Sequence, residues 1–525
     1  MDSSKFRETS HEAIDYVISY LESLRSRKPR TDVTPGYMSQ LVQDQAPDEG
    51  ESWDKVKDDL DQVIMPGMTH WQSPQFHSFV PYRSTYPAII GTILAAGFGT
   101  LGFTWSSASE VVLVTMMCAR KQTIKRLRKS YPDCSDGQLL DKLVAYTSDQ
   151  AHCSVTKAAS MSMVRMHVLS TDAKGSLRGP ALRKAIEKDR ARGLVPFFVC
   201  ATVGTTAVCA SDNLTELGPI CTEESLWFHL DAAFSGCATL LPECRYLIDG
   251  VEWATQHVNW KLQNWRHVWF SDESNFLISR YDRRRRVYRH RNERSATRCT
   301  SQALLHGCGS VIVWGAINHT RRSNLHCTTV VIDPYKWLGV PIGISAMWIQ
   351  DSSLLTEPYR MGPAYLEEPA QTGDVHMPDF MFSLFSSHLK HWQIAIGRGF
   401  RPLTLWMLLR ICGVNGLQNQ LRKDIVLAHE FRKLVQQDRR FEIVGEVTVC
   451  VVCFRLKGSN SLNLALRERL RADGRLHLRT ATFKGVVFLR FCVCSARSEI
   501  EDIRFAWDVV QKLSTAELEN SIIKL

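Results

Sequence analysis

Two continuous apolar runs in the middle of the chain constrain its fold more than any other feature of the sequence. Residues 195–201 read VPFFVCA and lead to Gly204, and residues 226–230 read LWFHL and lead to Asp231. Uninterrupted apolar runs that end at turn residues are typical of strands buried on both faces, as in parallel sheets. A helical segment over 180–192, with a proline at its start, precedes the first run. This alternation predicts an α/β layer fold with a mainly parallel sheet.

The first part of the chain follows a different pattern. Apolar side chains repeat at helical spacing over residues 4–26, which predicts an amphipathic N-terminal helix. The α/β rhythm then runs as far as Ala254 and resumes near Val330. Residues 255–327 between these points are rich in Trp and Arg and fit neither pattern. We therefore expect an insertion over 255–327 that interrupts the large domain.

The C-terminal part predicts a separate small α+β domain over residues 413–525. Strand-like and helical stretches occur together here, namely strands over 441–456 and 486–494 and helices over 461–472 and 500–512. The pair Cys450 and Cys453 has the spacing of a metal or redox motif. It lies in a Val-rich strand with no second pair nearby, so we expect no metal site.

Composition places the chain among ordinary globular proteins. Of its 525 residues, 44% are hydrophobic and 22% are charged. We expect no secretory signal and no membrane-spanning segment. The sixteen cysteines are dilute and mostly lie among apolar residues, which favours free thiols in a reducing cytoplasm. Much of the net charge of +10 comes from an arginine cluster over 283–298, so it is a local feature.

Two charged residues are the strongest candidates for chemistry. Asp231 ends a buried strand, where a carboxylate is costly unless a cation, such as a protonated pyridine nitrogen, pairs with it. Helix capping is the alternative. Lys336 lies in the segment DPYKW (333–337) after an apolar run, where burial would lower its pKa and let it form a Schiff base with an aldehyde. A lysine that reaches the surface is the alternative.

Small residues at two turns predict a place for an anion. Residues 107–110 read SASE before an apolar helix, and free N–H groups at a helix N-terminus bind phosphate. Residues 204–206 read GTT at the carboxyl end of a strand, where ligands bind in open α/β sheets. A plain helix cap explains the first turn equally well. His152 could stack on an aromatic ring, although a single histidine is more often structural.

The order of these features, together with several longer strings, resembles the aromatic-L-amino-acid decarboxylase family. The strings are MPGMTHWQSPQFHSFVP (65–81), SDQAHCSV (148–155), PFFVCATVGTTAVCASDNL (196–214), LWFHLDAAFSG (226–236), HWQIAIGRGFR (391–401) and VCFRLKGSN (452–460). The resemblance covers residues 1–254 and about 330–515. It implies a fold-type-I enzyme that uses pyridoxal 5'-phosphate (PLP), works as a homodimer and converts an aromatic L-amino acid to its amine and CO2.

The resemblance also implies the domain roles and the site residues. Residues 1–85 would form an N-terminal dimerisation segment, and 86–254 with 328–412 would form the PLP-binding domain. Carried over by position, Lys336 would hold PLP, Asp231 would pair with its ring nitrogen, and His152 and Ala233 would cover the two ring faces. The phosphate would be held by Ala108, Ser109, Thr206 and Asp333. The mobile loop would supply Tyr365 as proton donor, the partner site would receive Leu101 and Phe103, and the substrate pocket would include Tyr82 and Gly397.

Glycine at position 397 is what aromatic decarboxylases carry, whereas histidine decarboxylases carry serine there. This favours L-DOPA, 5-hydroxytryptophan, tyrosine or phenylalanine as the substrate. Tyr82 replaces a small threonine of the family and would narrow the pocket. No membrane partner and no nucleic-acid partner is expected.

The sequence departs from the family at three places. The family usually has Asn-Pro-His-Lys where this chain has DPYK (333–336), so Asp333 would bring a carboxylate towards the phosphate. Trp105 is followed at once by Ser106, where the family has a further helix and a glycine-rich run. These changes leave open a catalytically impaired protein with the same fold.

The third departure is the candidate insertion. Residues 264–294 and 307–317 resemble mariner-type transposases, and Asp272 would match one carboxylate of their catalytic triad. The other two acids cannot be placed, and two-metal phosphoryl transfer needs all three. The arginines could still bind nucleic acid non-specifically. We interpret the segment as a mobile element fused into a decarboxylase gene, or as an error in joining exons.

Overall fold

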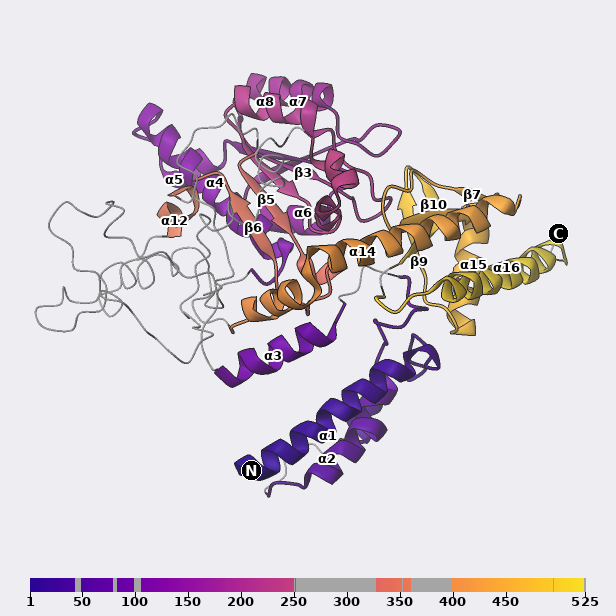
Figure 1. The fold of residues 1–525 in the computed structure, drawn as a ribbon. Helices are drawn as coiled ribbons and strands as arrows, with labels where there is room; N and C mark the ends of the chain where they lie inside the picture. Colours follow the sequence, from indigo (N-terminus) through magenta and orange to yellow (C-terminus); the bar gives the residue numbers. More distant parts are fainter. Residues whose placement is uncertain are drawn as a thin grey trace, which may run out of the picture.

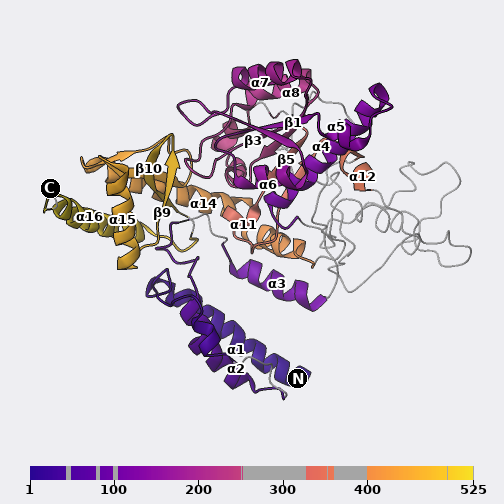
Figure 2. The same cartoon turned by 180° about the vertical axis from the view of Figure 1, so that it is seen from behind.

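The computed structural model describes residues 1–42, 49–78, 83–98, 105–249, 251, 327–351, 353–359, 399–493 and 495–523. Figure 1 shows three parts: N-terminal helices, a central domain around a sheet, and a C-terminal domain with a second sheet. The view from behind in Figure 2 shows the same arrangement, with α14 running from the central domain to the C-terminal one. Among the described residues, no helix is long and apolar enough to cross a membrane.

The central sheet confirms the predicted parallel α/β fold. Its strand order is β2-β1-β3-β4-β5-β6, and all neighbours are parallel except β5 and β6. The strands are β1 (Leu143–Ser148), β2 (Arg165–Leu169), β3 (Val195–Thr202), β4 (Trp227–Asp231), β5 (Thr329–Ile332) and β6 (Ala346–Ile349). Strand β5 pairs directly with β4, with His229 opposite Thr329. The sheet therefore continues across the candidate insertion.

Both faces of this sheet are buried, which explains the continuous apolar runs of β3 and β4. Neighbouring residues of one strand enter different cores, as Val144 and Ala145 of β1 do. The first core contains side chains of α7 and α8, and the second contains those of α4 and α6. The helices of this domain are α4 (Ala108–Ser130), α5 (Asp136–Leu140), α6 (Cys153–Met161), α7 (Gly179–Ala191), α8 (Leu214–Glu223), η5 (Ser235–Leu240), η6 (Pro242–Ile248), α11 (Pro334–Trp337) and α12 (Ser353–Tyr359).

A long helix connects the central domain to the C-terminal one. Helix α14 (Pro402–Gln437) is kinked at Gly413, whose φ of 64° lies outside the helical region. Its first half packs on α3 (Tyr86–Phe98), where a Cβ on Gly91 would lie 2.7 Å from Thr404 Cα. The close approach therefore requires a glycine at position 91.

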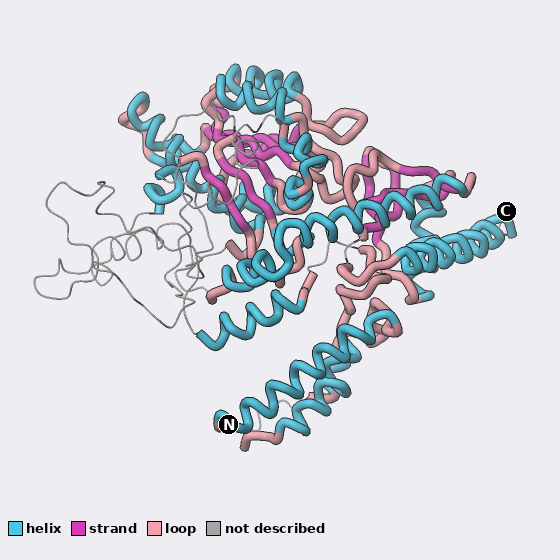
Figure 3. Tube along the Cα trace, in the orientation of Figure 1, coloured by secondary structure: helices cyan, strands magenta, loops and turns pink. Residues whose placement is uncertain are grey.

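The C-terminal domain combines a group of strands with helices, as Figure 3 shows. The strands form an antiparallel sheet in the order β7-β8-β10-β9. Its elements are β7 (Phe441–Ile443), β8 (Val451–Leu456), α15 (Asn460–Asp473), β9 (Arg479–Phe483), β10 (Val486–Cys492) and α16 (Ile500–Ile523). The predicted strand over 441–456 is thus two strands, and the last helix extends eleven residues beyond the predicted 512. This α+β architecture agrees with the sequence pattern, while the domain bounds stay a prediction.

The N-terminal segment contains α1 and α2 side by side, with short turns of helix around them. Its elements are α1 (Ser3–Glu22), η1 (Ser23–Arg25), η2 (Tyr37–Gln40), α2 (Trp53–Asp59), η3 (Leu60–Ile64) and η4 (Met65–Gly67). Arg25 forms an ion pair of 2.5 Å with Asp502 of the C-terminal domain. Only Thr9 and Leu21 of α1 are buried. Most of this helix therefore faces solvent in the single chain.

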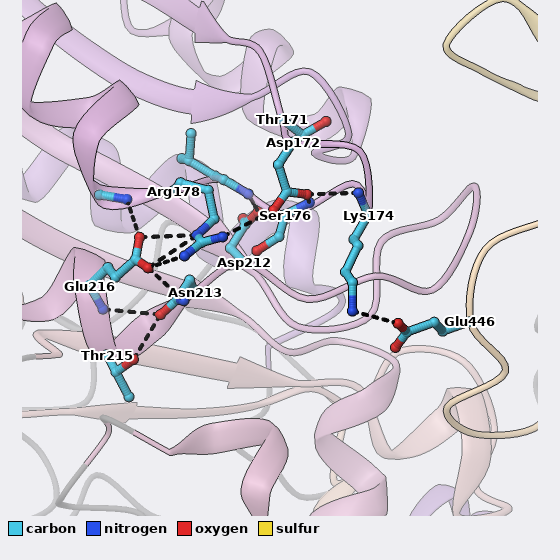
Figure 4. Close-up of polar contacts among 12 residues, drawn as sticks. Thr171, Asp172, Lys174, Ser176, Arg178, Asp212, Asn213, Thr215, Glu216 and Glu446 are labelled. Atoms are coloured by element: carbon cyan, nitrogen blue, oxygen red, sulfur yellow. Dashed lines mark hydrogen bonds and ion pairs between the residues drawn. The ribbon is translucent and has the colours of Figure 1, made fainter.

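A polar network fixes the loops next to the end of β3. Figure 4 shows Asp212 close to Asp172 and Arg178. The Asp212 carboxylate accepts the N–H groups of Leu177 and Thr202, both at 2.7 Å. In the same view Lys174 reaches Glu446 of the C-terminal domain at 2.8 Å. The network holds the carboxyl end of β3 in place, where the candidate site begins.

Candidate active site

A cavity of about 330 Å³ lies at the carboxyl ends of the central strands. It brings together all the predicted site residues that the structure describes, namely Ala108, Ser109, His152, Thr206, Asp231, Ala233, Asp333 and Lys336. The other predicted residues lie outside the described parts of the chain, namely Tyr82, Leu101, Phe103, Tyr365 and Gly397. The parallel topology explains the gathering, because the loops that follow parallel strands meet at one edge of the sheet.

Asp231 is the last residue of β4, and 5% of its surface is exposed. Its Oδ1 accepts the N–H of Ala233 at 3.1 Å. Burial raises the pKa of Asp231, while the nearby Lys336 opposes this shift. The capping alternative fails, because the next helix, η5, has Phe234 at its N-cap and no side-chain cap. A buried carboxylate in this position is suited to pairing with a cation inside the cavity.

Lys336 lies on the short helix α11, directly after β5. Its side chain is 27% exposed, and Nζ lies 3.2 Å from Oδ2 of Asp333. The lysine thus reaches the cavity wall as one half of an ion pair. Its side chain is therefore only partly buried, and an acid rather than apolar groups alone lies next to the amine. Tyr335, the residue before Lys336, also lines the cavity, and burial raises the pKa of its hydroxyl.

His152 occupies the N-cap of α6 and lines the same cavity. Its Nδ1 accepts the N–H of Ser154 at 3.2 Å and lies 2.8 Å from the Ser154 hydroxyl. Burial lowers the pKa of His152, and the positive charge of Lys336 lowers it further. The imidazole is therefore neutral near pH 7, with a flat face available to an aromatic ring.

The N-terminus of α4 lies in the SASE segment (107–110), for which the sequence predicts a helix cap or an anion site. The structure is compatible with both. Ser107 caps the helix by accepting the N–H of Glu110, and Ala108 and Ser109 line the cavity. At the second turn, Gly204 has a φ of 82°, and a Cβ there would lie 1.9 Å from Oγ of Ser235. A side chain at this position would clash with Ser235, and Gly204 itself lines the cavity.

Sequence reasoning missed several residues of the cavity wall. These are Trp71, Ser154, Thr202, Phe234 and Arg490. Arg490 of β10 is 7% exposed; its Nη1 donates to Ser78 O at 3.3 Å, and its Nε has no hydrogen-bond partner among the described residues. The available signal was an arginine inside the apolar run VVFLRFC (486–492), because such a residue is seldom buried without a partner.

A mainly parallel α/β fold with a lysine, a buried acid and a helix N-terminus in one cavity fits the PLP-binding class of enzymes. Comparison with known proteins names the family. A model described as pyridoxal-dependent decarboxylase conserved domain matches residues 35–108, 106–271 and 309–457. The chain therefore belongs to the pyridoxal-dependent decarboxylases, which are carboxy-lyases that use PLP.

Relatives and solved structures agree with this assignment. The chain is 35% identical to aromatic-L-amino-acid decarboxylase of Rattus norvegicus, over 99% of each chain. The fold is similar to that of Oryza sativa TDC with PLP and tryptamine, with a TM-score of 0.79 and 26% identity over 98% and 99% of the two chains. Catharanthus roseus tryptophan decarboxylase in complex with L-tryptophan gives a TM-score of 0.74 and 26% identity over the same shares. These confirm the expected fold-type-I fold.

The breaks in the family match coincide with two of the predicted departures. The first two matched stretches meet at residues 106–108, where the chain passes directly from Trp105 to the start of α4. Residues 272–308 lie between the second and third stretches, inside the predicted insertion. The match thus extends further into 255–327 than the sequence pattern indicated.

The cavity residues fit PLP at its aldehyde and ring ends. Lys336 offers an amine, Asp231 is a buried acid that forms no ion pair with a cationic side chain among the described residues, and His152 offers a neutral ring. The phosphate end also fits in shape, because Ala108, Ser109 and Thr206 are small and line the cavity. Asp333 is the exception, since its carboxylate stands where an anion would bind.

Proposed function

We propose that this chain removes CO2 from an aromatic L-amino acid, with Lys336 holding the cofactor and Asp231 supporting its ring nitrogen. The convergence of these two side chains in one cavity carries the proposal. Asp231 ends β4 and Lys336 lies on α11 directly after β5, so the pairing of these two strands places them together although they are 105 positions apart in the sequence. The aromatic lining by Trp71, Phe234 and Tyr335 supports an aromatic substrate.

PLP, when bound, accepts the electron pair that the departing CO2 leaves behind. The protein's own contribution is positioning and charge. Asp231 would keep a proton on the ring nitrogen, and burial strengthens this interaction because the local dielectric is low. His152 and Ala233 would hold the ring between them. Arg490 brings a positive charge to the wall, where a substrate carboxylate would find a partner.

The remaining roles are proposals that rest on the resemblance. We propose Tyr365 as the proton donor to the substrate α-carbon, Ala108, Ser109, Thr206 and the residue at 333 as the phosphate site, and Tyr82 and Gly397 as part of the substrate pocket. We also propose a homodimer in which Leu101 and Phe103 reach the partner's site. One face of α3 supports this, because its apolar side chains are exposed in the single chain: Tyr86, Ile90, Ile93, Leu94 and Phe98.

The test combines cofactor binding with product formation. Purified protein with PLP should show the visible absorbance of lysine-bound cofactor and release CO2 from L-DOPA, 5-hydroxytryptophan, tyrosine or phenylalanine. Lys336→Ala should lose both. The control is Lys174→Ala, because Lys174 lies in an exposed ion pair with Glu446 outside the cavity lining. Retention of the visible band in Lys336→Ala would show that another amine holds PLP.

We further propose that residues 255–327 are a transposase-derived insertion into the large domain. We also propose the domain bounds 1–85, 86–254 with 328–412, and 413–525. Two observations support an insertion here: the family match pauses over 272–308, and β5 continues the sheet beside β4. A full-length transcript read across positions 254/255 and 327/328 tests it. A transcript that lacks this stretch would contradict the proposal.

A further inference from the structure

We propose that Asp333 is a built-in anion that competes with the cofactor phosphate for the N-terminus of α4, so that this side chain sets the affinity of the chain for PLP. The inference rests on the proposed role of the cavity as the PLP site. It concerns the residue at which the chain has an acid in place of the family's usual asparagine.

The contacts of Asp333 involve the groups that a phosphate would use. Its Oδ1 accepts the N–H of Ala108 at 3.0 Å, and this N–H belongs to the first residue of α4. The same oxygen accepts the hydroxyl of Ser345, and Oδ2 lies 3.2 Å from Nζ of Lys336. The first N–H groups of a helix have no partner within the helix and favour negative charge. Here an internal carboxylate already occupies one of them.

Asp333 is held firmly in this position. Its side chain is 1% exposed, and its donors come from three separate segments, namely α4, α11 and the residues before β6. Its own backbone N–H donates to Ala233 O at 3.1 Å, and Pro334 follows it directly. Moving the carboxylate away from α4 would therefore break several contacts at once. A phosphate that reaches the helix N-terminus must meet this charge at close range.

The charge balance of the cavity strengthens the effect. Among the described lining residues, Lys336 and Arg490 are cationic, and Asp231 and Asp333 are anionic, while His152 is neutral. The wall therefore offers no net positive charge to a phosphate group. Changing Asp333 to asparagine would give the same wall a net charge of +1 and would keep an oxygen to accept the N–H of Ala108.

The experiment compares PLP with pyridoxal, which lacks the phosphate. Apo protein is titrated with each compound, and binding is followed by quenching of tryptophan fluorescence and by visible absorbance. Asp333→Asn should lower the dissociation constant for PLP at least about tenfold and that for pyridoxal far less, because only PLP carries the repelled charge. Asp333→Ser removes the same charge with a shorter side chain and should change the PLP affinity in the same direction.

The control is Asp189→Asn. Asp189 is also a buried carboxylate with hydrogen bonds, to Tyr146 and His167, but it lies outside the lining of this cavity. The Asp189→Asn variant should therefore bind PLP and pyridoxal with the same affinity as wild type. Equal PLP affinity of wild type and both Asp333 variants would overturn the inference. An equal gain for PLP and pyridoxal would also overturn it, because Asp333 would then act through Lys336. Absence of the lysine-bound absorbance in every protein at saturating PLP would overturn the proposed function itself.

Discussion

Breaking the buried ion pair between Arg83 and Asp424 should strongly destabilise the region around Lys336. The two side chains are 2% and 0% exposed. The Asp424 carboxylate also accepts the indole N–H of Trp337 at 2.8 Å and an amide N–H of Gln420 at 3.1 Å. Because Trp337 follows Lys336 directly, this carboxylate joins α14 to the segment that carries the candidate cofactor lysine.

Asp424→Asn keeps the shape of the side chain and removes its charge. The buried Arg83 guanidinium would then lack its carboxylate partner, and breaking such a pair costs about 3–5 kcal/mol. Urea unfolding followed by tryptophan fluorescence measures the change in the free energy of unfolding. The matched control is Glu243→Gln, which breaks the exposed pair of Glu243 with Arg422, whose side chains are 52% and 42% exposed. That variant should lose less than about 1 kcal/mol.

The losses of unfolding free energy in Asp424→Asn and Glu243→Gln are then compared. If Asp424→Asn lost no more stability than Glu243→Gln, the buried pair would not be the stabilising contact that its geometry indicates. A double variant, Arg83→Met with Asp424→Leu, gives a second check. Removal of both charges should cost less than removal of one, because no buried charge is left without its partner. A double variant less stable than Asp424→Asn would contradict this account.

Two further predictions concern a buried histidine and a constrained glycine. Burial lowers the pKa of His229 to about 3, so its stabilising effect is present above the unfolded-state value near 6.5 and is lost as the pH falls towards 3. Between pH 6.5 and 5, wild type should lose about 1–2 kcal/mol more unfolding free energy than His229→Phe, and parallel pH curves would refute this. Gly204→Ala should lower the melting temperature more than Gly193→Ala, because both have positive φ (82° and 77°) but only position 204 also clashes, with Ser235. Equal shifts would show that Ser235 moves aside freely.

Much of the central fold could be predicted from the sequence because its signals are local. The runs over 195–201 and 226–230 became β3 and β4, since burial on both faces requires apolar residues at every position. The antiparallel β6 could not be predicted in this way, because strand direction depends on the path of the connecting chain. Similarly, the single strand expected over 441–456 is two strands, β7 and β8, which pair with each other.

The sequence alone determined which chemistry the chain could support: an acid at the end of a buried strand, a lysine after another, and small residues at a helix N-terminus. Only the tertiary structure decided which groups meet. It brought Arg490 of the C-terminal domain into the cavity and joined the carboxylate of Asp333 to the N–H of Ala108, 225 residues earlier in the chain. The physical reason is that local patterns report whether a residue is buried and in which element, whereas hydrogen bonds and ion pairs between distant residues depend on how the layers pack.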